Sequence, residues 1–286
     1  MSSRWHRPEH GDAWIMGVLN CTPDSFSDGG SHADVADAVT HGMMMWEQGA
    51  KIIDVGGEST RPGASPVPLD EEIARVLPVV QALAEAGVAV SIDTMKAEVM
   101  RQSIRAGACL VNDVSALRHD SESMAVVAET GADVCLMHMQ GTPEMMQQQP
   151  RYDDVVSEVM AFFESRINAC LRAGVAASSI LLDPGIGFGK RLQDNINLIC
   201  AIGDIKRQFA MPVLLGVSRK SFLGMLTGTD AENREIETAA ANAIGIAQGA
   251  DMLRVHDVGQ QKRAVQVASS LTHQVLHDRL SRCRDA

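Results

Sequence analysis

The chain has 286 residues, of which 45% are hydrophobic and 21% are charged, and its formal net charge at pH 7 is −11. This apolar content suits one sizeable core, and the charged content is too low for a disordered chain. The acidic balance excludes non-specific binding to nucleic acid and adhesion to an anionic membrane, but a local cluster of Arg and Lys still permits an anionic small-molecule substrate.

The chain begins with a short polar segment, residues 1–12, that has no apolar stretch typical of a signal peptide. Nowhere do 18 apolar residues run without interruption, so we expect no membrane span. The six cysteines form no C-x-x-C pair, and several lie inside apolar runs. We therefore expect buried, reduced thiols in a cytoplasmic protein.

After this segment one pattern recurs: an amphipathic helix ends in Gly, a small residue usually follows, and a short apolar strand runs into a polar residue. Each Gly fits the position just after a helix, where φ is positive. The glycines in question are Gly49, Gly87, Gly107, Gly131, Gly174 and Gly249. Two further apolar segments, Trp14–Leu19 and Pro212–Gly216, read as strands without this glycine.

In chain order the pattern predicts eight strands with helices between them. The strands are Trp14–Leu19, Ile52–Asp54, Val90–Asp93, Leu110–Asn112, Val134–His138, Ile180–Asp183, Pro212–Gly216 and Met252–Arg254. The helices cover roughly residues 34–48, 70–86, 96–106, 121–130, 152–173, 192–209, 233–249 and 258–280.

Strands this rich in Val, Ile and Leu are buried on both faces, as in parallel sheets. Eight strands in steady alternation with helices predict a single (β/α)₈ TIM barrel, with a doubly wound open sheet as the alternative. No linker interrupts the series, so we expect one domain over residues 1–286, with its core at about 14–280. The active site of such a barrel lies at the C-terminal ends of the strands.

Every predicted strand leads into polar residues. They are Asn20; Asp54, Glu58, Thr60 and Arg61; Asp93; Asn112 and Asp113; His138; Asp183; Ser218, Arg219 and Lys220; and Arg254, His256 and Asp257. One polar strand end is as often a turn or a helix cap as a site. Eight of them on one barrel rim indicate an active site.

These residues divide by chemistry. Asp93, Asn112 and Asp183 supply acceptors and an amide, which suits a flat heterocycle with an amino-pyrimidinone edge. The anion-binding candidates are Asn20, Arg61, Arg254 and His256. Lys220 lies beside the start of a predicted helix, where backbone N–H groups favour a carboxylate or a phosphate.

The glycine-rich run Asp183–Lys190 is not a P-loop. Its glycine spacing is one residue short, and Arg191 stands where Ser or Thr must hold magnesium. We interpret the run as a bent loop that presents Phe188 to a pocket. No His/Cys spacing suits zinc, and no Ser–His–Asp arrangement is readable.

From about Ile15 to Val258 the sequence resembles the dihydropteroate synthase family. The matching motifs are Met16–Asn20, Thr22–Gly30, Asp54–Gly63, Ser91–Thr94, Met137–Gly141, Asp183–Lys190, Gly216–Ser221 and Arg254–Asp257. The resemblance implies a pterin-binding transferase of folate biosynthesis that uses Mg²⁺. It also implies that the enzyme belongs to a family that sulfonamides target. The implied substrates are 6-hydroxymethyl-7,8-dihydropterin pyrophosphate and 4-aminobenzoate, and the products are 7,8-dihydropteroate and pyrophosphate.

The resemblance also assigns roles to residues. The pterin is expected on Asp93, Asn112, Met137, Asp183, Lys220 and Arg254, with Arg254 stacked on its face. The pyrophosphate is expected on Asn20, Arg61, Arg254 and His256, with Asn20 also a Mg²⁺ ligand. The 4-aminobenzoate is expected on Thr60, Pro62, Phe188, Lys220 and Ser221. The expected catalytic residues are Asp28, Arg61, Asp93 and Lys220.

Pyrophosphate would leave from a carbon attached to an electron-rich ring, so we expect an SN1-like path through a resonance-stabilised pterin cation. The Asp93 carboxylate would offset the positive charge of this cation. The weakly basic aniline nitrogen then needs no strong general base. In the family the first two strand–helix loops close over the site, and Phe26, Asp28 and Arg61 would complete the pocket. A homodimer through late helices such as 233–249 and 258–280 is also implied.

Two alternatives stay open at this point. A methyltetrahydrofolate-type methyltransferase would share the Asp/Asn floor, but it should lack the Thr22–Gly30 loop and the Ser218–Ser221 anchor, which are present. A non-catalytic pterin-binding paralogue should lack part of the set Asn20, Asp28, Arg61, Lys220, Arg254 and His256, which is complete here. We assign no role to Gly224–Arg234.

Overall fold

The computed structural model describes residues 3–9, 11–22, 32–60 and 63–284. Within them, eight strands pair in parallel in one sheet, in the order β6-β5-β4-β3-β2-β1-β8-β7. A parallel bridge between Leu182 and Val213 links β6 to β7 and closes the sheet into a barrel. The predicted TIM barrel is confirmed, and the open sheet is wrong. The strands are β1 (Trp14–Asn20), β2 (Ile52–Gly56), β3 (Val90–Asp93), β4 (Leu110–Asp113), β5 (Asp133–Met137), β6 (Ile180–Asp183), β7 (Leu214–Leu215) and β8 (Met252–Val255).

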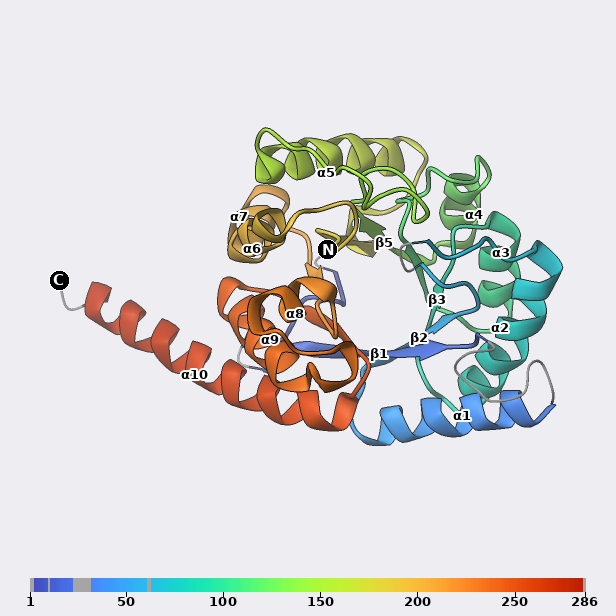
Figure 1. The fold of residues 1–286 in the computed structure, drawn as a ribbon, viewed down its shortest axis with the longest axis horizontal. Helices are drawn as coiled ribbons and strands as arrows, with labels where there is room; N and C mark the ends of the chain where they lie inside the picture. Colours follow the sequence, from blue (N-terminus) through green and yellow to red (C-terminus); the bar gives the residue numbers. More distant parts are fainter. Residues whose placement is uncertain (1–2, 10, 23–31, 61–62, 285–286) are drawn as a thin grey trace.

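The helices form a ring around the strands (Figure 1). They are α1 (His32–Glu47), α2 (Leu69–Glu85), α3 (Ala97–Arg105), α4 (Ser123–Thr130), α5 (Val155–Arg172), α6 (Leu192–Cys200), α7 (Ile202–Phe209), α8 (Ser221–Thr227), α9 (Glu235–Gln248) and α10 (Val258–Arg284). α9 and α10 pack side by side, and α10 extends beyond the barrel (Figure 1).

The glycines that predicted the helix ends all have positive φ, as expected. They are Gly49, Gly87, Gly107, Gly131, Gly174 and Gly249. α7 ends without a glycine, and there Ala210 takes the left-handed conformation, with φ of 51°. A non-glycine residue adopts this conformation at a steric cost, which the surrounding packing must offset.

Two predicted elements differ from the structure, and one helix was not predicted. The helix expected over 192–209 is two helices, which meet at Ala201. A Cβ on Gly203 would lie 3.0 Å from the carbonyl oxygen of Gln248, so this glycine lets α7 approach the end of α9 closely. The strand expected over 212–216 is two residues long, because Pro212 has no N–H and the N–H of Val213 donates to the Asp251 carboxylate. α8 occupies part of the unassigned segment.

The end of the barrel at which the strands begin is filled by apolar side chains. They form one buried cluster of Trp5, Met16, Ile52, Leu110, Cys135, Leu181, Leu214 and Met252. Trp5 comes from the N-terminal segment, is 3% exposed, and donates from Nε1 to Oδ2 of Asp133 at 2.7 Å. The apolar filling leaves polar side chains to the opposite end. Along the part of the chain that the structure describes, none of the helices is long and apolar enough to cross a membrane.

Candidate active site

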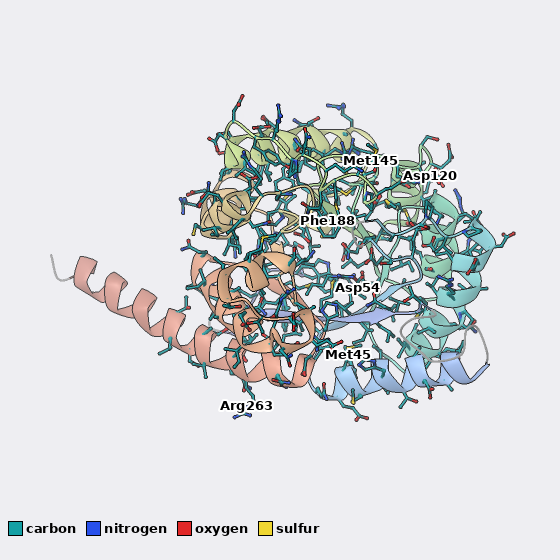
Figure 2. The ribbon with its side chains drawn as sticks, viewed as in Figure 1. Met45, Asp54, Asp120, Met145, Phe188 and Arg263 are labelled. Carbon is teal, nitrogen blue, oxygen red and sulfur yellow. The ribbon has the colours of Figure 1, made fainter. Side chains whose placement is uncertain are left out.

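A small cavity of about 40 Å³ opens at the C-terminal ends of the strands. Inward-facing residues alternate along each barrel strand, so polar side chains from different strands reach this cavity together. Its lining includes Thr60, Asp93, Asn112, Met137, Asp183, Phe188, Lys220, Arg254 and His256. Figure 2 places Phe188 over the middle of the barrel, with Asp54 below it in the view. The six residues expected to hold the pterin therefore line one cavity.

Arg254 occupies the floor of this cavity with two carboxylates. Its Nε donates to Oδ2 of Asp54 at 2.6 Å, and its Nη2 donates to Oδ2 of Asp93 at 2.7 Å. The amide nitrogen of Asn112 donates to the same Oδ2 of Asp54 at 2.8 Å. β2, β3, β4 and β8 thus contribute to one hydrogen-bonded network. The nearby carboxylates raise the pKa of Arg254, so the guanidinium stays charged.

Burial raises the pKa of Asp93 to about 7. The charge of Arg254 opposes this rise, whereas the neighbouring Asp54, Glu72 and Asp113 carboxylates add to it. Without its partner cation, this carboxyl would be harder still to ionise. Asp93 is therefore a carboxyl group whose pKa lies near neutral pH. It contacts a cation and lines a cavity.

Asp183 and Lys220 both line the cavity, and their charges interact. Burial raises the pKa of Asp183, and the Gly185 N–H, which donates to its Oδ1 at 2.7 Å, opposes the rise. Desolvation lowers the pKa of Lys220 to about 8, and the charge of Asp183 opposes that shift. Nζ of Lys220 lies 4.0 Å from the centre of the Phe188 ring, a cation–π contact. The pair can offer one acceptor and one donor to a heterocycle edge.

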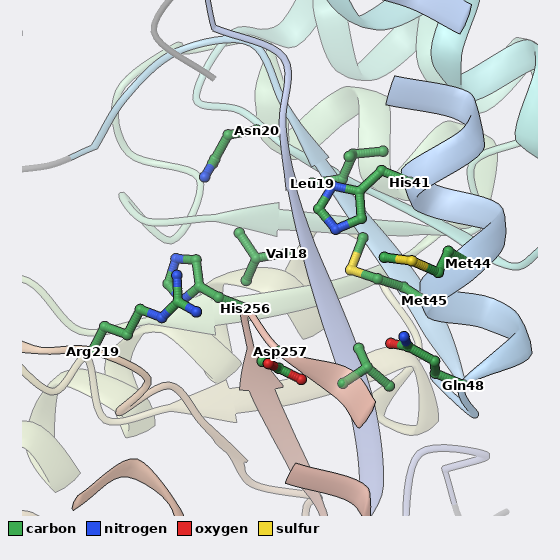
Figure 3. Close-up of a pocket in the computed structure, with 11 residues that line it drawn as sticks. Val18, Leu19, Asn20, His41, Met44, Met45, Gln48, Arg219, His256 and Asp257 are labelled. Atoms are coloured by element: carbon green, nitrogen blue, oxygen red, sulfur yellow. The ribbon is translucent and has the colours of Figure 1, made fainter. Parts of the chain in front are cut away.

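A second, larger cavity of about 350 Å³ lies between the ends of β1 and β8, α1 and the start of α10. It is lined by Val18, Leu19, Asn20, His41, Met44, Met45, Gln48, Arg219, His256, Asp257 and Val258. In Figure 3 the side chains of Asn20, His256 and Arg219 lie on one side of β1, and those of His41, Met44 and Gln48 lie on the other. Both Asn20 and His256 belong to the expected anion group.

Local hydrogen bonds orient the polar side chains of this second cavity. The Ser218 hydroxyl lies 2.9 Å from Nδ1 of His256 and accepts from the His256 N–H at 3.2 Å. Arg219 has a φ of 57° and is tied to α9, through its N–H to the Thr238 hydroxyl and its Nε to Glu235 at 2.6 Å. His256 lines both cavities, so the two form neighbouring parts of one site.

The residues expected around 4-aminobenzoate are only partly described. Thr60 and Phe188 line the small cavity, and Ser221 is exposed at the first residue of α8. Phe26, Asp28, Arg61 and Pro62 lie outside the described residues.

Three strand-end residues singled out in the sequence have structural partners instead. Glu58 accepts from Lys96 at 2.6 Å and from the Val67 N–H. Asp113 accepts from the N–H groups of Ser115 and Leu117 and so caps its own turn. His138 lies against Lys190, and burial lowers its pKa to about 3, so its ring is neutral.

Sequence reasoning gave no role to Asp54 or Lys190. Asp54 is fully buried yet contacts both Arg254 and Asn112. The available signal was a charged residue inside an otherwise apolar strand, since buried charges are paired. Lys190 is 3% exposed, and its signal was a lysine at the end of a glycine-rich loop.

Among the described residues, no group of three or more His, Cys, Asp and Glu side chains is arranged to hold a metal ion. Asn20 is the residue proposed from sequence as a ligand, and Asp257 lines the same cavity. Mg²⁺ usually keeps several waters and takes one or two protein oxygens together with substrate phosphates. This sparse donor set fits an ion that arrives with an anionic substrate.

The comparisons with known proteins agree with this geometry. The family model described as "Pterin binding enzyme" matches residues 16–256. The dihydropteroate synthase of Escherichia coli (strain K12) is 47% identical over 257 residues, which is 90% of each chain.

Two experimental structures are also similar. The Yersinia pestis dihydropteroate synthase with a sulfonamide drug has a TM-score of 0.87 at 43% identity and covers 95% of this chain and 98% of its own. The Xanthomonas albilineans dihydropteroate synthase with 4-aminobenzoic acid has a TM-score of 0.85 at 44% identity and covers 92% of this chain and 94% of its own.

Proposed function

Since the chain belongs to the pterin-binding enzymes, and among them to the dihydropteroate synthases, it is a transferase, and we propose that its two neighbouring cavities divide the reaction between them. The enzyme condenses 6-hydroxymethyl-7,8-dihydropterin pyrophosphate with 4-aminobenzoate to 7,8-dihydropteroate and pyrophosphate. The observation that best supports the division is that Asp93, Asn112, Asp183, Lys220 and Arg254 converge on one small cavity.

The small cavity takes the pterin. The Asp93 and Asp183 carboxylates accept hydrogen bonds from the amino and ring N–H groups, and Asn112 and Lys220 serve the remaining edge. Met137 packs against the ring. Arg254 stacks on the pterin face, which requires that it loosen its bond to Asp93 while it keeps its bond to Asp54. Asp93 is then free to accept from the substrate.

The larger cavity takes the pyrophosphate. Asn20 and His256 both line it, whereas Arg254 lines only the pterin cavity and would reach the pyrophosphate from there. Arg61, outside the described residues, completes this group in our proposal. Asn20 would hold Mg²⁺ through its amide oxygen, and the ion when bound would offset the charge of the leaving diphosphate.

The reaction proceeds by departure before attack. The bond from the pterin methylene carbon to the pyrophosphate oxygen breaks, and its electron pair leaves with the pyrophosphate. The positive charge that develops on the pterin is offset by the Asp93 carboxylate in a pocket of low dielectric constant. The amine of 4-aminobenzoate then forms the new C–N bond with the activated carbon. The anilinium nitrogen that results is strongly acidic and releases its proton to an oxygen of the departed pyrophosphate, so the protein supplies orientation and electrostatic stabilisation without a strong general base.

The 4-aminobenzoate ring lies against Phe188 and Thr60, and its carboxylate is bound by the hydroxyl of Ser221 with the aliphatic stem of Lys220 beside it. Pro62 and the side chains of Phe26, Asp28 and Arg61 cover the pocket in this proposal. Their closure would exclude the water that otherwise quenches the pterin cation.

We also propose that the enzyme is a cytoplasmic homodimer. Large apolar side chains are exposed on three consecutive helices, α8, α9 and α10. They are Met225, Leu226, Ile236, Ile244, Val267 and Leu271. Several exposed large apolar side chains on helices that pack together, as α9 and α10 do, are typical of interfaces between subunits. The free cysteines among the described residues suit a reducing compartment.

A direct assay tests the function. The purified protein is incubated with the pterin pyrophosphate, 4-aminobenzoate and Mg²⁺, and pyrophosphate release and 7,8-dihydropteroate formation are both measured. One pyrophosphate per product is expected. Pterin binding without turnover would identify a non-catalytic paralogue, and methyl transfer from methyltetrahydrofolate without pyrophosphate release would identify the methyltransferase alternative.

A further inference from the structure

The loop between β6 and α6 carries Phe188 and is folded tightly against the loop between β5 and α5. Gly185, Gly187 and Gly189 all have positive φ. A Cβ on Gly185 would collide with the carbonyl oxygen of His138, and one on Gly189 would collide with that of Gln140. Only glycine permits this approach of two backbones. The position of Phe188 therefore depends on how the two loops are joined.

Lys190 joins them at the centre. Its Nζ donates to the carbonyl oxygen of Phe188 at 3.0 Å and to that of His138 at 3.2 Å, and it lies 3.0 Å from Nδ1 of His138. Since the pKa of His138 is lowered to about 3, its neutral ring offers a lone pair to the ammonium. All three N–H groups of Lys190 therefore have acceptors. Burial nevertheless lowers the pKa of Lys190 to about 7, so the group is fully an ammonium only below that pH.

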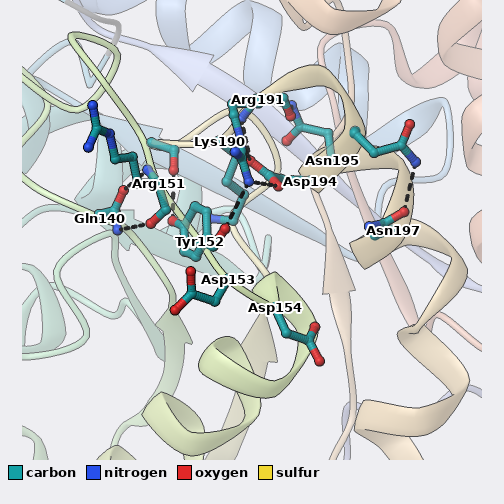
Figure 4. A network of polar contacts seen from close by, with 12 residues as sticks. Gln140, Arg151, Tyr152, Asp153, Asp154, Lys190, Arg191, Asp194, Asn195 and Asn197 are labelled. Atoms are coloured by element: carbon teal, nitrogen blue, oxygen red, sulfur yellow. Dashed lines mark hydrogen bonds and ion pairs between the residues drawn. The ribbon is translucent and has the colours of Figure 1, made fainter.

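Further hydrogen bonds surround this centre (Figure 4). The Tyr152 hydroxyl donates to the Gly189 carbonyl at 2.7 Å, and Nη2 of Arg191 donates to the Tyr152 carbonyl at 3.2 Å. The Gly187 N–H donates to Oδ1 of Asn195 at 2.7 Å. These bonds hold the outer part of the loop, whereas Lys190 alone among them holds the carbonyl of Phe188 itself.

The Phe188 ring transmits this restraint to the cavity. It packs against the methionine-rich cluster of Val114, Met137, Met139 and Met146, and it lies beneath the ammonium of Lys220. Lys190 is not among the residues that line either cavity. The route from Lys190 to the 4-aminobenzoate subsite therefore passes through Phe188. The charge of Lys190 also acts on Asp183 in the pterin cavity, but less than the Gly185 N–H and Lys220 do.

We propose that Lys190 is a positioning residue for the 4-aminobenzoate subsite, because it holds Phe188 at the wall of that subsite. The inference rests on the proposed function and adds to it a determinant that lies outside the pocket. A purely structural role would instead affect stability and both substrates alike.

The test is Lys190→Met, which keeps the stem and removes the three donors. We expect the KM for 4-aminobenzoate to rise about tenfold or more, the loss expected from about 1.4 kcal/mol of binding energy, while the KM for the pterin substrate changes much less. Lys206→Met is the matched control, since Lys206 bonds to the Gly249 carbonyl and Asp251 at the opposite end of the barrel. It should leave both KM values unchanged.

A double-mutant cycle with Phe188→Leu isolates the route. If Lys190 acts through Phe188, the two substitutions together raise the KM for 4-aminobenzoate no more than the larger single change. Equal rises in both KM values, additive effects, or a folded Lys190→Met enzyme with wild-type KM values would overturn the proposal.

If circular dichroism shows that Lys190→Met does not fold, Tyr152→Phe is the second variant, because it removes the hydrogen bond from the Tyr152 hydroxyl to the Gly189 carbonyl in the same loop. It should produce a smaller rise confined to 4-aminobenzoate, and no selective rise would count against the proposal. If the wild-type enzyme released no pyrophosphate, the proposed function itself would be refuted. Failure of the proposed function is thus distinguishable from failure of the role proposed for Lys190.

Discussion

Nε of Arg254 lies 2.6 Å from Oδ2 of Asp54, although the two residues are 200 positions apart in the chain. The same carboxylate oxygen accepts from the amide of Asn112. Asp54 is fully buried and is absent from the lining of the cavity. One carboxylate beneath the cavity thus orients two of the side chains that we assign to the pterin.

We expect Asp54→Asn to lower kcat/KM for the pterin substrate by roughly tenfold or more, because a charge-assisted hydrogen bond contributes about 1.5–3 kcal/mol. The isosteric amide keeps the packing but weakens the hold on Arg254. Steady-state kinetics measures the effect, and Asp153→Asn at an exposed position is the control. Unchanged kinetics would show that Asp93 alone suffices to orient Arg254.

The pH profile should be bell-shaped. Pterin binding needs the Asp93 carboxylate, whose pKa is raised to about 7, so kcat/KM should rise as the pH increases through that value. It needs the Lys220 ammonium, whose pKa is lowered to about 8, so kcat/KM should fall above it. Asp93→Asn should fold normally, lose most turnover and lack the acidic limb. Near-normal turnover of that variant would remove Asp93 from the mechanism.

Ser221→Ala should weaken the binding of 4-aminobenzoate more than the binding of the pterin substrate. The lost bond would be to a carboxylate, which corresponds to roughly a tenfold rise in its KM. The measurement is the pair of KM values at saturating concentrations of the other substrate. A similar rise in both values would show that Ser221 does not select the carboxylate.

Pyrophosphate should promote pterin binding in the presence of Mg²⁺, because the anion would occupy the donors of Asn20 and His256 and leave Arg254 free to cover the pterin. Isothermal calorimetry of a pterin with and without pyrophosphate measures this coupling. Removal of Mg²⁺ with a chelator should abolish it. Identical affinities in all three conditions would contradict a shared anion subsite.

Ile236 is 83% exposed on α9, and Ile236→Glu should dissociate the proposed homodimer. A buried unpaired carboxylate in an apolar interface is costly, whereas an exposed one on a monomer is not. Analytical ultracentrifugation of the variant and of Glu129→Gln, an exposed residue on α4, provides the comparison. A monomeric wild-type enzyme would refute the proposed homodimer, and a dimeric Ile236→Glu variant would place the interface elsewhere.

The architecture was predictable because its signals are local. A helix that ends in glycine and an apolar strand that follows it depend on residues within a few positions, and all six glycines so identified have positive φ. The rim residues Asp93, Asn112 and Asp183 followed from the rule that parallel strands end at the same edge. The break at Ala201 was missed because alanine is the strongest helix former and gives no local signal for the end of a helix.

The sequence by itself determined the barrel, its site-bearing end and the family to which its motifs belong. Only the tertiary structure decided how the side chains pair: that Arg254 rests on Asp54, that His138 serves Lys190 instead of the cavity, and that Trp5 closes the opposite end of the barrel. Strand periodicity states which face a side chain occupies. Which partner it meets there depends on barrel closure, which brings together residues that are far apart in the chain.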